Sequence, residues 1–248
     1  MSGTDLPADG TPQPAPPTFG VPAHDALILS GGRSSRLGGE PKALLRAGGT
    51  TLLARTVEAA AGAGQLAVVG PEEYLRASGL APGQCLSVRE DPPYSGPAAA
   101  IGAGLDALDR AGAGAPWLLV LACDMPGIAA AVDALLKAAG SPGTPPGTSL
   151  LACAEGRAQP LAGLHDAAAL RAAVREQREA GGLENLSVFK LLARVQRREV
   201  PVPAGSTSDV DTWEDARRAG AVAGPGPSNA GAPEPQQRST YGKPGGAA

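Results

Sequence analysis

Short apolar runs alternate along the middle of the chain with longer stretches whose apolar residues recur at helical spacing. The runs are apolar throughout, which is typical of strands that are buried on both faces of a parallel sheet. We predict strands at residues 26–30, 66–70, 85–89, 117–122 and 150–154, and helices at residues 50–63, 71–77, 97–111 and 129–139. This alternation predicts an α/β fold, with a doubly wound, mostly parallel sheet flanked by helices.

The pattern continues beyond a connector rich in Pro and Gly at residues 141–148. We expect a strand at 161–165, helices at 167–180 and 186–195, a strand at 198–202 and a last helix that begins near Thr212. Ligands of such sheets bind beyond the carboxyl ends of the strands, so function is expected in the loops that follow the strands.

Composition separates the two ends of the chain from its middle. The 248 residues include 35 Gly and 25 Pro, which are most frequent at the two ends. Such segments bury too little apolar surface to fold, so we predict disordered tails at 1–22 and 223–248 and one domain at 23–222. Aromatic residues make up only 3% of the chain, so the core must consist of Leu, Val, Ile and Ala.

Charge and hydropathy exclude several classes of protein. A net charge of −3 provides no basic surface for a nucleic acid. No apolar run reaches the length of a membrane span, and the N-terminus lacks the basic and apolar segments of a secretory signal. The three cysteines are widely spaced, which argues against a disulfide framework. We therefore expect a cytoplasmic protein that binds neither nucleic acid nor membranes.

The loop after the first predicted strand is rich in glycine and positive charge. Residues 27–45 read LILSGGRSSRLGGEPKALL, with two glycine pairs and the cations Arg33, Arg36 and Lys42. Glycines let backbone N–H groups approach an anion closely, and the cations suit a triphosphate. The segment matches neither the P-loop nor the dinucleotide-binding pattern. The alternative is an ordinary glycine-rich turn with solvated charges.

A carboxylate, Asp124, closely follows the apolar strand predicted at 117–122. Mg²⁺ prefers a few carboxylates together with phosphate oxygens, so an aspartate at this edge of the sheet is a natural ligand. Asp124 could instead cap the turn that follows the strand.

Four ordered motifs resemble those of the MobA-like nucleotidyltransferases. The pattern LxGGxSxRxGxxK is matched from Leu29 to Lys42, through Ser34 and Arg36. Residues 89–97, 121–126 and 209–215 resemble three further elements of the family. The resemblance spans about residues 24–220 and implies a Rossmann-like nucleotidyltransferase fold. Trp213 replaces the proline usual in the last element, which leaves the metal role of that element less certain.

The resemblance also implies roles for individual residues. Lys42, Arg36 and Asp124 would act in catalysis, and Asp124 and Asp211 would bind Mg²⁺. Asp211 or Thr212 could alternatively cap the last helix, and Asp91 could belong to an ordinary turn. The nucleotide would contact Leu29, Ser30, Gly31, Gly32, Lys42, Gly70, Asp91 and Asp124.

The activity that the resemblance implies is transfer of GMP from Mg²⁺-bound GTP to the phosphate of molybdenum-bound molybdopterin, with release of pyrophosphate. Transient contact with molybdoenzymes or cofactor-insertion proteins is implied as well. Gly31 favours guanine, because a residue without Cβ leaves room beside a purine. Pro41 before Lys42, however, resembles the cytidylyltransferase relatives.

Three alternatives to guanylyl transfer therefore stay open. They are cytidylyl transfer to molybdopterin, nucleotidyl transfer to another phosphorylated acceptor, and a nucleotide-binding module without catalysis. The scarcity of aromatic residues further predicts that the base is recognised by backbone more than by stacking.

Overall fold

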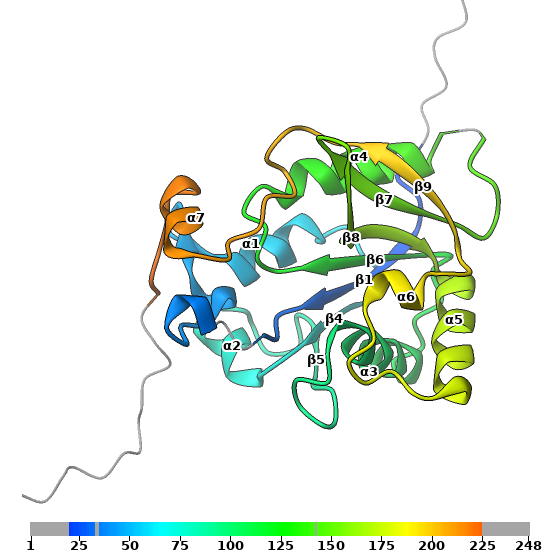
Figure 1. Ribbon diagram of the computed structural model, residues 1–248, viewed down its shortest axis with the longest axis horizontal. Helices are drawn as coiled ribbons and strands as arrows, with labels where there is room; N and C mark the ends of the chain where they lie inside the picture. Colours follow the sequence, from blue (N-terminus) through cyan, green and yellow to red (C-terminus); the bar gives the residue numbers. More distant parts are fainter. Residues whose placement is uncertain (1–19, 33–34, 142, 225–248) are drawn as a thin grey trace, which may run out of the picture.

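The structure is a computed structural model that describes residues 20–32, 35–141 and 143–224 (Figure 1). Its centre is a seven-stranded sheet in the order β5-β4-β1-β6-β8-β7-β9. The first four strands are parallel, β8 runs antiparallel to both β6 and β7, and β9 is parallel to β7. The bounds are β5 Leu86–Val88, β4 Leu66–Val69, β1 His24–Leu29, β6 Trp117–Ala122, β8 Arg157–Asp166, β7 Thr148–Ala154 and β9 Gln196–Pro201.

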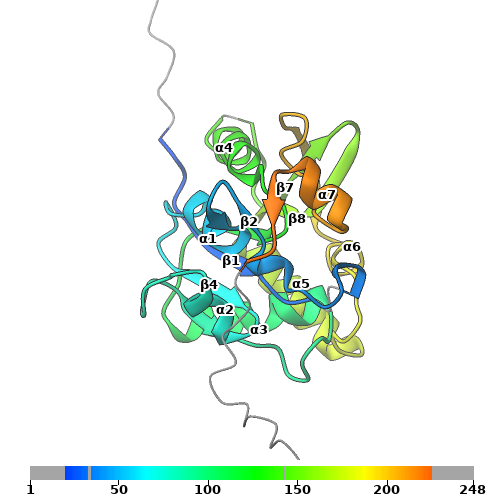
Figure 2. The ribbon, with the colours of Figure 1, turned by 90° about the vertical axis from the view of Figure 1, so that its left-hand side faces the viewer.

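Helices cover both faces of this sheet (Figures 1 and 2). In β1, Ala26 and Ile28 belong to one hydrophobic cluster and Leu27 and Leu29 to the other, because successive side chains of a strand point to opposite faces. The first cluster contains α1 (Leu52–Ala59), α2 (Glu72–Ala77) and α4 (Ile128–Ala139), and the second contains α3 (Pro97–Arg110), α5 (Ala167–Ala180) and α6 (Val188–Leu191). The predicted fold class is confirmed.

A second, smaller sheet lies beside the main one. It pairs β10 (Ala221–Val222), β2 (Arg46–Ala47) and β3 (Thr50–Thr51) in antiparallel order. The 3-10 helices η1 (Ser35–Leu37) and η2 (Lys42–Leu44) and the helix α7 (Trp213–Arg218) complete this region. We call these elements the small-sheet unit; its own core consists of Leu37, Leu45, Ala47, Leu52, Val210, Ala216 and Ala221.

Some predicted bounds differ from the observed ones. The strand expected at 161–165 begins earlier, at Arg157, because it forms an antiparallel pair with β7. The helix expected at 186–195 is the single turn Val188–Leu191. The predicted tails lie almost entirely outside the described residues. Within the described part of the chain, no helix is long and apolar enough to cross a membrane.

Candidate functional site

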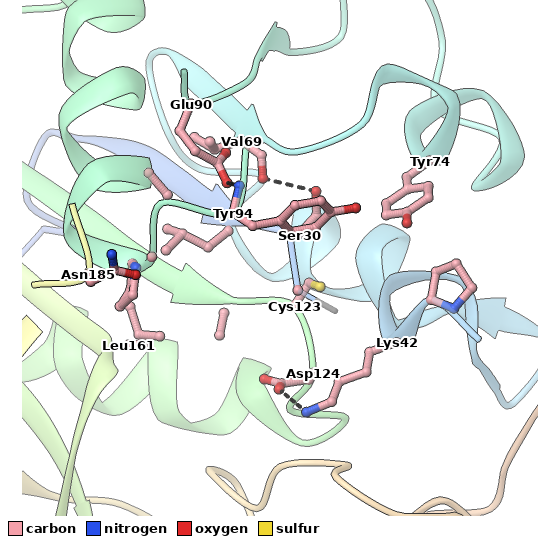
Figure 3. Close-up of a pocket in the computed structure, with 18 residues that line it drawn as sticks. Ser30, Lys42, Val69, Tyr74, Glu90, Tyr94, Cys123, Asp124, Leu161 and Asn185 are labelled. Carbon is pink, nitrogen blue, oxygen red and sulfur yellow. Dashed lines mark hydrogen bonds and ion pairs between the residues drawn. The ribbon is translucent and has the colours of Figure 1, made fainter. Parts of the chain in front are cut away.

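A cavity of about 610 Å³ lies at the carboxyl ends of the parallel strands (Figure 3). The strands β1, β4 and β6 end side by side because they pair in parallel register. The lining of the cavity combines the loop after β1, the ends of β1, β4 and β6, the loops after β5 and β6, residues of η2, α2, α3 and β8, and the loop between α5 and α6. The residues are Leu29, Ser30, Gly31, Gly32, Pro41, Lys42, Val69, Tyr74, Glu90, Tyr94, Gly96, Pro97, Ala100, Ala122, Cys123, Asp124, Leu161 and Asn185.

The loop after β1 is fastened to the end of β4. The backbone N–H of Ser30 donates to the carbonyl of Val69 at 2.9 Å, and its hydroxyl donates to the same carbonyl at 3.1 Å. Gly70 passes so close that a Cβ there would overlap the Ser30 hydroxyl and lie 3.2 Å from the N–H nitrogen of Gly31. Gly70 also has a φ of +155°, in the range that favours glycine. The lack of a side chain at Gly70 therefore lets the loop after β1 pack directly against the end of β4.

Lys42 meets two carboxylates in the same site. Its Nζ lies 3.0 Å from Oδ2 of Asp124 and also donates to Oδ1 of Asp211. Burial lowers the pKa of Lys42, but the charge of Asp124 and the hydrogen bonds to both aspartates outweigh that effect, so the pKa lies above its usual value. The side chain is therefore an ammonium ion at neutral pH and supplies positive charge at the cavity.

Asp211 reaches this site from the small-sheet unit. The N–H of Val210 donates to the carbonyl of Asp124 at 2.9 Å, which holds the segment before α7 against the end of β6. Thr212 caps α7 by accepting from the N–H of Asp215, and the Asp215 side chain completes a capping box. Thr212, and not Asp211, is therefore the N-terminal cap of α7. The Asp211 carboxylate instead contacts Lys42.

The donor set fits a magnesium ion. Asp124 and Asp211 share one cationic partner, and carboxylate oxygens are the ligands that Mg²⁺ takes together with phosphate oxygens and water. Asp209 lies near both carboxylates, and burial together with the charges of Asp211 and Asp124 raises the pKa of its own carboxyl group. Among the described residues, no group of three or more acidic, His or Cys side chains forms a metal site by itself. A metal here would depend on ligands from the substrate.

The structure brings most of the predicted site residues together, but not all of them. Asp91 is exposed and lines a separate hollow along α3 and α5. The Arg36 side chain is 74% exposed and lies 3.6 Å from Asp211, outside the cavity lining. Arg33 and Ser34 fall outside the described residues. The predicted contacts that line the cavity are Leu29, Ser30, Gly31, Gly32, Lys42 and Asp124.

Among the lining residues that the sequence did not predict as contacts, four have aromatic, carboxylate or amide side chains: Glu90, Tyr74, Tyr94 and Asn185. Glu90 is the neighbour of the predicted Asp91 in the same motif. The motif therefore indicated the correct loop but not the residue of that loop that lines the cavity. Two of the seven aromatic residues of the chain line this one cavity, which removes the reason to expect that a base is recognised by backbone more than by stacking. Asn185 belongs to a loop whose approach depends on tertiary structure, with its N–H 2.7 Å from the carbonyl of Ser95.

Residues 26–197 match a family model described as the MobA-like NTP transferase domain. That range contains β6, the last four residues of β1 and every residue of the cavity lining. The match thus covers well over half of the chain.

A protein from Synechococcus elongatus, named probable molybdenum cofactor guanylyltransferase, is similar in sequence. It is 41% identical to the chain over 108 residues, which are 43% of this chain and 53% of that protein. The chain spans about half the length of the curated relatives it matches.

Solved structures share the fold over most of the chain. Rv0371c from Mycobacterium tuberculosis H37Rv has a TM-score of 0.60 and 25% identity, over 81% of this chain and 98% of that one. The 2-C-methyl-D-erythritol 4-phosphate cytidylyltransferase from Thermus thermophilus has a TM-score of 0.56 and 22% identity, over 80% of this chain and 97% of that one. The second likeness shows the fold alone.

Proposed function

The chain belongs to the MobA-like NTP transferase family, and from that premise we propose that it transfers GMP from GTP to the phosphate of molybdenum-bound molybdopterin, releasing pyrophosphate. The observation that carries the proposal is the position of Lys42 between two carboxylates at the mouth of a cavity lined by Gly31 and Gly32. The name of the Synechococcus relative supports this acceptor and this donor.

The reaction needs little proton transfer from the protein. An oxygen of the acceptor phosphate attacks the α-phosphorus of the nucleotide, a P–O bond forms, and the bond to the β-phosphate breaks. The attacking phosphate is already anionic near neutral pH, so no general base is required. This agrees with the position of His165, which is buried in the sheet and does not line the cavity.

The side chains around the cavity would position the reactants and offset negative charge. Lys42 would leave its aspartates for the phosphates, where a fixed positive charge stabilises the charge that develops during transfer. The N–H groups near Gly31 and Gly32 would face the phosphates, since their loop is fastened to β4. Asp124 and Asp211 would hold Mg²⁺, which would neutralise phosphate charge and orient the α-phosphate when bound.

The test is release of pyrophosphate from GTP in the presence of Mg²⁺ and molybdenum-loaded molybdopterin. We expect turnover in the wild type and a loss of about 100-fold or more in Asp124→Asn, because an amide cannot replace the charged metal ligand. Asp133→Asn is the matched control, since Asp133 is an exposed residue of α4. GTP binding without pyrophosphate release with any acceptor would show a nucleotide-binding module instead of an enzyme.

A second candidate donor is CTP, favoured by Pro41, which lines the cavity directly before Lys42. A thermal-shift panel of GTP, CTP, ATP and UTP with Mg²⁺ separates the two donors. A nucleotide at 100 times its Kd stabilises the folded protein by about 2.7 kcal/mol. We expect the largest increase in melting temperature with GTP. A larger increase with CTP would show that the donor is CTP and not GTP.

A further inference from the structure

The carboxylate of Glu90 is buried in the wall of the cavity. Glu90 is only 8% exposed, and no ion pair among the described residues includes it. The backbone N–H of Tyr94 donates to its Oε1 at 3.0 Å. A carboxylate has about four acceptor positions, and burying one is costly unless donors fill them. Glu90 can therefore accept further N–H groups from a ligand.

Glu90 and the phosphate-binding residues stand at different ends of the cavity. Figure 3 shows Glu90 and Tyr94 at one end, and Lys42 and Asp124 at the other. Gly31 also lines the cavity, and a Cβ on Gly31 would lie 3.9 Å from the Glu90 Oε1. A nucleotide with its phosphates at Lys42 would thus extend its base toward Glu90.

Tyr94, whose backbone N–H donates to this carboxylate, also lines the cavity. Tyr94 has a φ of +65°, a conformation that costs a non-glycine residue free energy, and the hydrogen bond to Glu90 helps to hold it. The Arg89 guanidinium lies 5.5 Å from the ring centroid and covers one face of the ring. The turn therefore presents a fixed aromatic surface at the same end of the cavity as Glu90.

We propose that Glu90 and Tyr94 form the base-reading end of the site, a proposal that rests on the function proposed above. The Glu90 carboxylate accepts hydrogen bonds from N1–H and the 2-amino group of guanine, and the Tyr94 ring stacks on the base. Only guanine offers two adjacent donors that match the fork of a carboxylate. Cytosine and adenine each offer one amino group on the corresponding edge. Donor choice thus depends on Glu90 as well as on Gly31.

The test compares the binding of GTP with that of ITP, which lacks only the 2-amino group of guanine. With Mg²⁺ and full-length protein, we expect the wild type to bind GTP about 10-fold or more tightly than ITP, because a hydrogen bond to a charged group is lost. In Glu90→Gln this ratio is expected to fall below about 3-fold, since the amide places a donor against guanine donors. The Gln oxygen can still accept from Tyr94 N–H, so the turn is retained.

Two further substitutions sharpen the test. Glu58→Gln is the matched control, because Glu58 is an exposed residue of α1, and it should keep the wild-type ratio. Tyr94→Ala is expected to weaken GTP and ITP alike, by about 10-fold, and to leave their ratio unchanged, since stacking does not depend on the 2-amino group.

Each outcome bears on the proposal in a defined way. If Glu90→Gln keeps the preference for GTP, or if Asp91→Asn removes it instead, Glu90 does not read the base and the inference fails, while guanylyl transfer stands. If the wild type binds CTP in preference to both purines, the proposed donor fails, and the base-reading role fails with it. Equal losses of GTP and ITP in Tyr94→Ala, with the ratio lost only in Glu90→Gln, support both roles.

Discussion

Lys42 joins the two parts of the molecule that build the site. It lies in η2 of the small-sheet unit and contacts Asp124 at the end of β6 and Asp211 before α7. Its ammonium group therefore stands where a cation shared by the two carboxylates would bind. If Asp124 and Asp211 hold a metal ion as proposed, Lys42 and that ion would compete for the same oxygens in the absence of a nucleotide. In the proposed complex with a nucleotide, the phosphates would supply a new partner for Lys42.

Lys42→Met is therefore expected to have two opposite effects. Transfer should fall by about 100-fold or more, because a positive charge that stabilises the reacting phosphates is lost. Binding of Mn²⁺, a spectroscopic substitute for Mg²⁺, should become tighter in the absence of nucleotide, because its competitor is gone. Electron paramagnetic resonance titration measures the second effect. Lys137→Met, at an exposed position of α4, is the control, and unchanged Mn²⁺ affinity in Lys42→Met would contradict the competition.

For single residues, the sequence predicts which types of side chain gather at the site better than it predicts how they are placed. That the glycines, Lys42 and Asp124 meet at one cavity could be predicted, because they lie in loops that follow neighbouring strands of a parallel sheet. Which of Glu90 and Asp91 lines the cavity could not be predicted, because the tertiary structure sets the directions in which neighbouring loop residues point. The meeting of Lys42 with Asp211 also depends on the fold, because 169 positions separate them in the chain.

At the scale of elements, α3 illustrates how alanine and glycine fit this sheet. Gly104 lies on the face of α3 that meets β1, and a Cβ at Gly104 would overlap Cδ1 of Leu27 and lie 3.0 Å from its Cδ2. The absence of a side chain lets the helix approach the strand. Since α3 begins at the cavity, with Pro97 in the lining, this close approach also positions one wall of the site.

Gly104→Ala is expected to destabilise the protein by about 1–3 kcal/mol, because overpacking a well-filled core outweighs the better helix propensity of alanine. Urea unfolding measures the change as a lower midpoint. Gly114→Ala is the matched control: a Cβ there meets nothing within 4 Å, so little change or a slight gain is expected. Equal midpoints for the two variants would show that α3 can shift away from Leu27 without cost.

Most strands and helices of the main sheet could be predicted, and the two-residue strands could not. Strand β6 and helix α5 have the predicted bounds, because uninterrupted apolar runs and helical periodicity carry clear signals over six or more residues. The strands of the small-sheet unit have two residues each, which is too short for any periodicity. The antiparallel direction of β8 could not be predicted either, because a strand buried on both faces has the same apolar pattern whichever way it runs.

For the whole molecule, the sheet holds one buried group that opposes folding in acid. His165 is 1% exposed on β8, and neither ring nitrogen has a hydrogen-bond partner among the described residues. Burial lowers the pKa of His165 from 6.5 to about 4. The unfolded chain therefore binds a proton between these pH values that the folded protein excludes.

The free energy of unfolding should consequently decline as pH falls from about 6.5 toward 4. At 1.36 kcal/mol for each unit of pKa, the contribution of His165 to this decline is about 3 kcal/mol. His165→Leu is expected to remove that part of the pH dependence and to raise stability at pH 5, because leucine buries no polar atoms. Urea unfolding of wild type and variant at several pH values measures the difference. Parallel pH profiles of the two proteins would contradict this account, because they would mean that His165 gains a hydrogen-bond partner or becomes accessible to water.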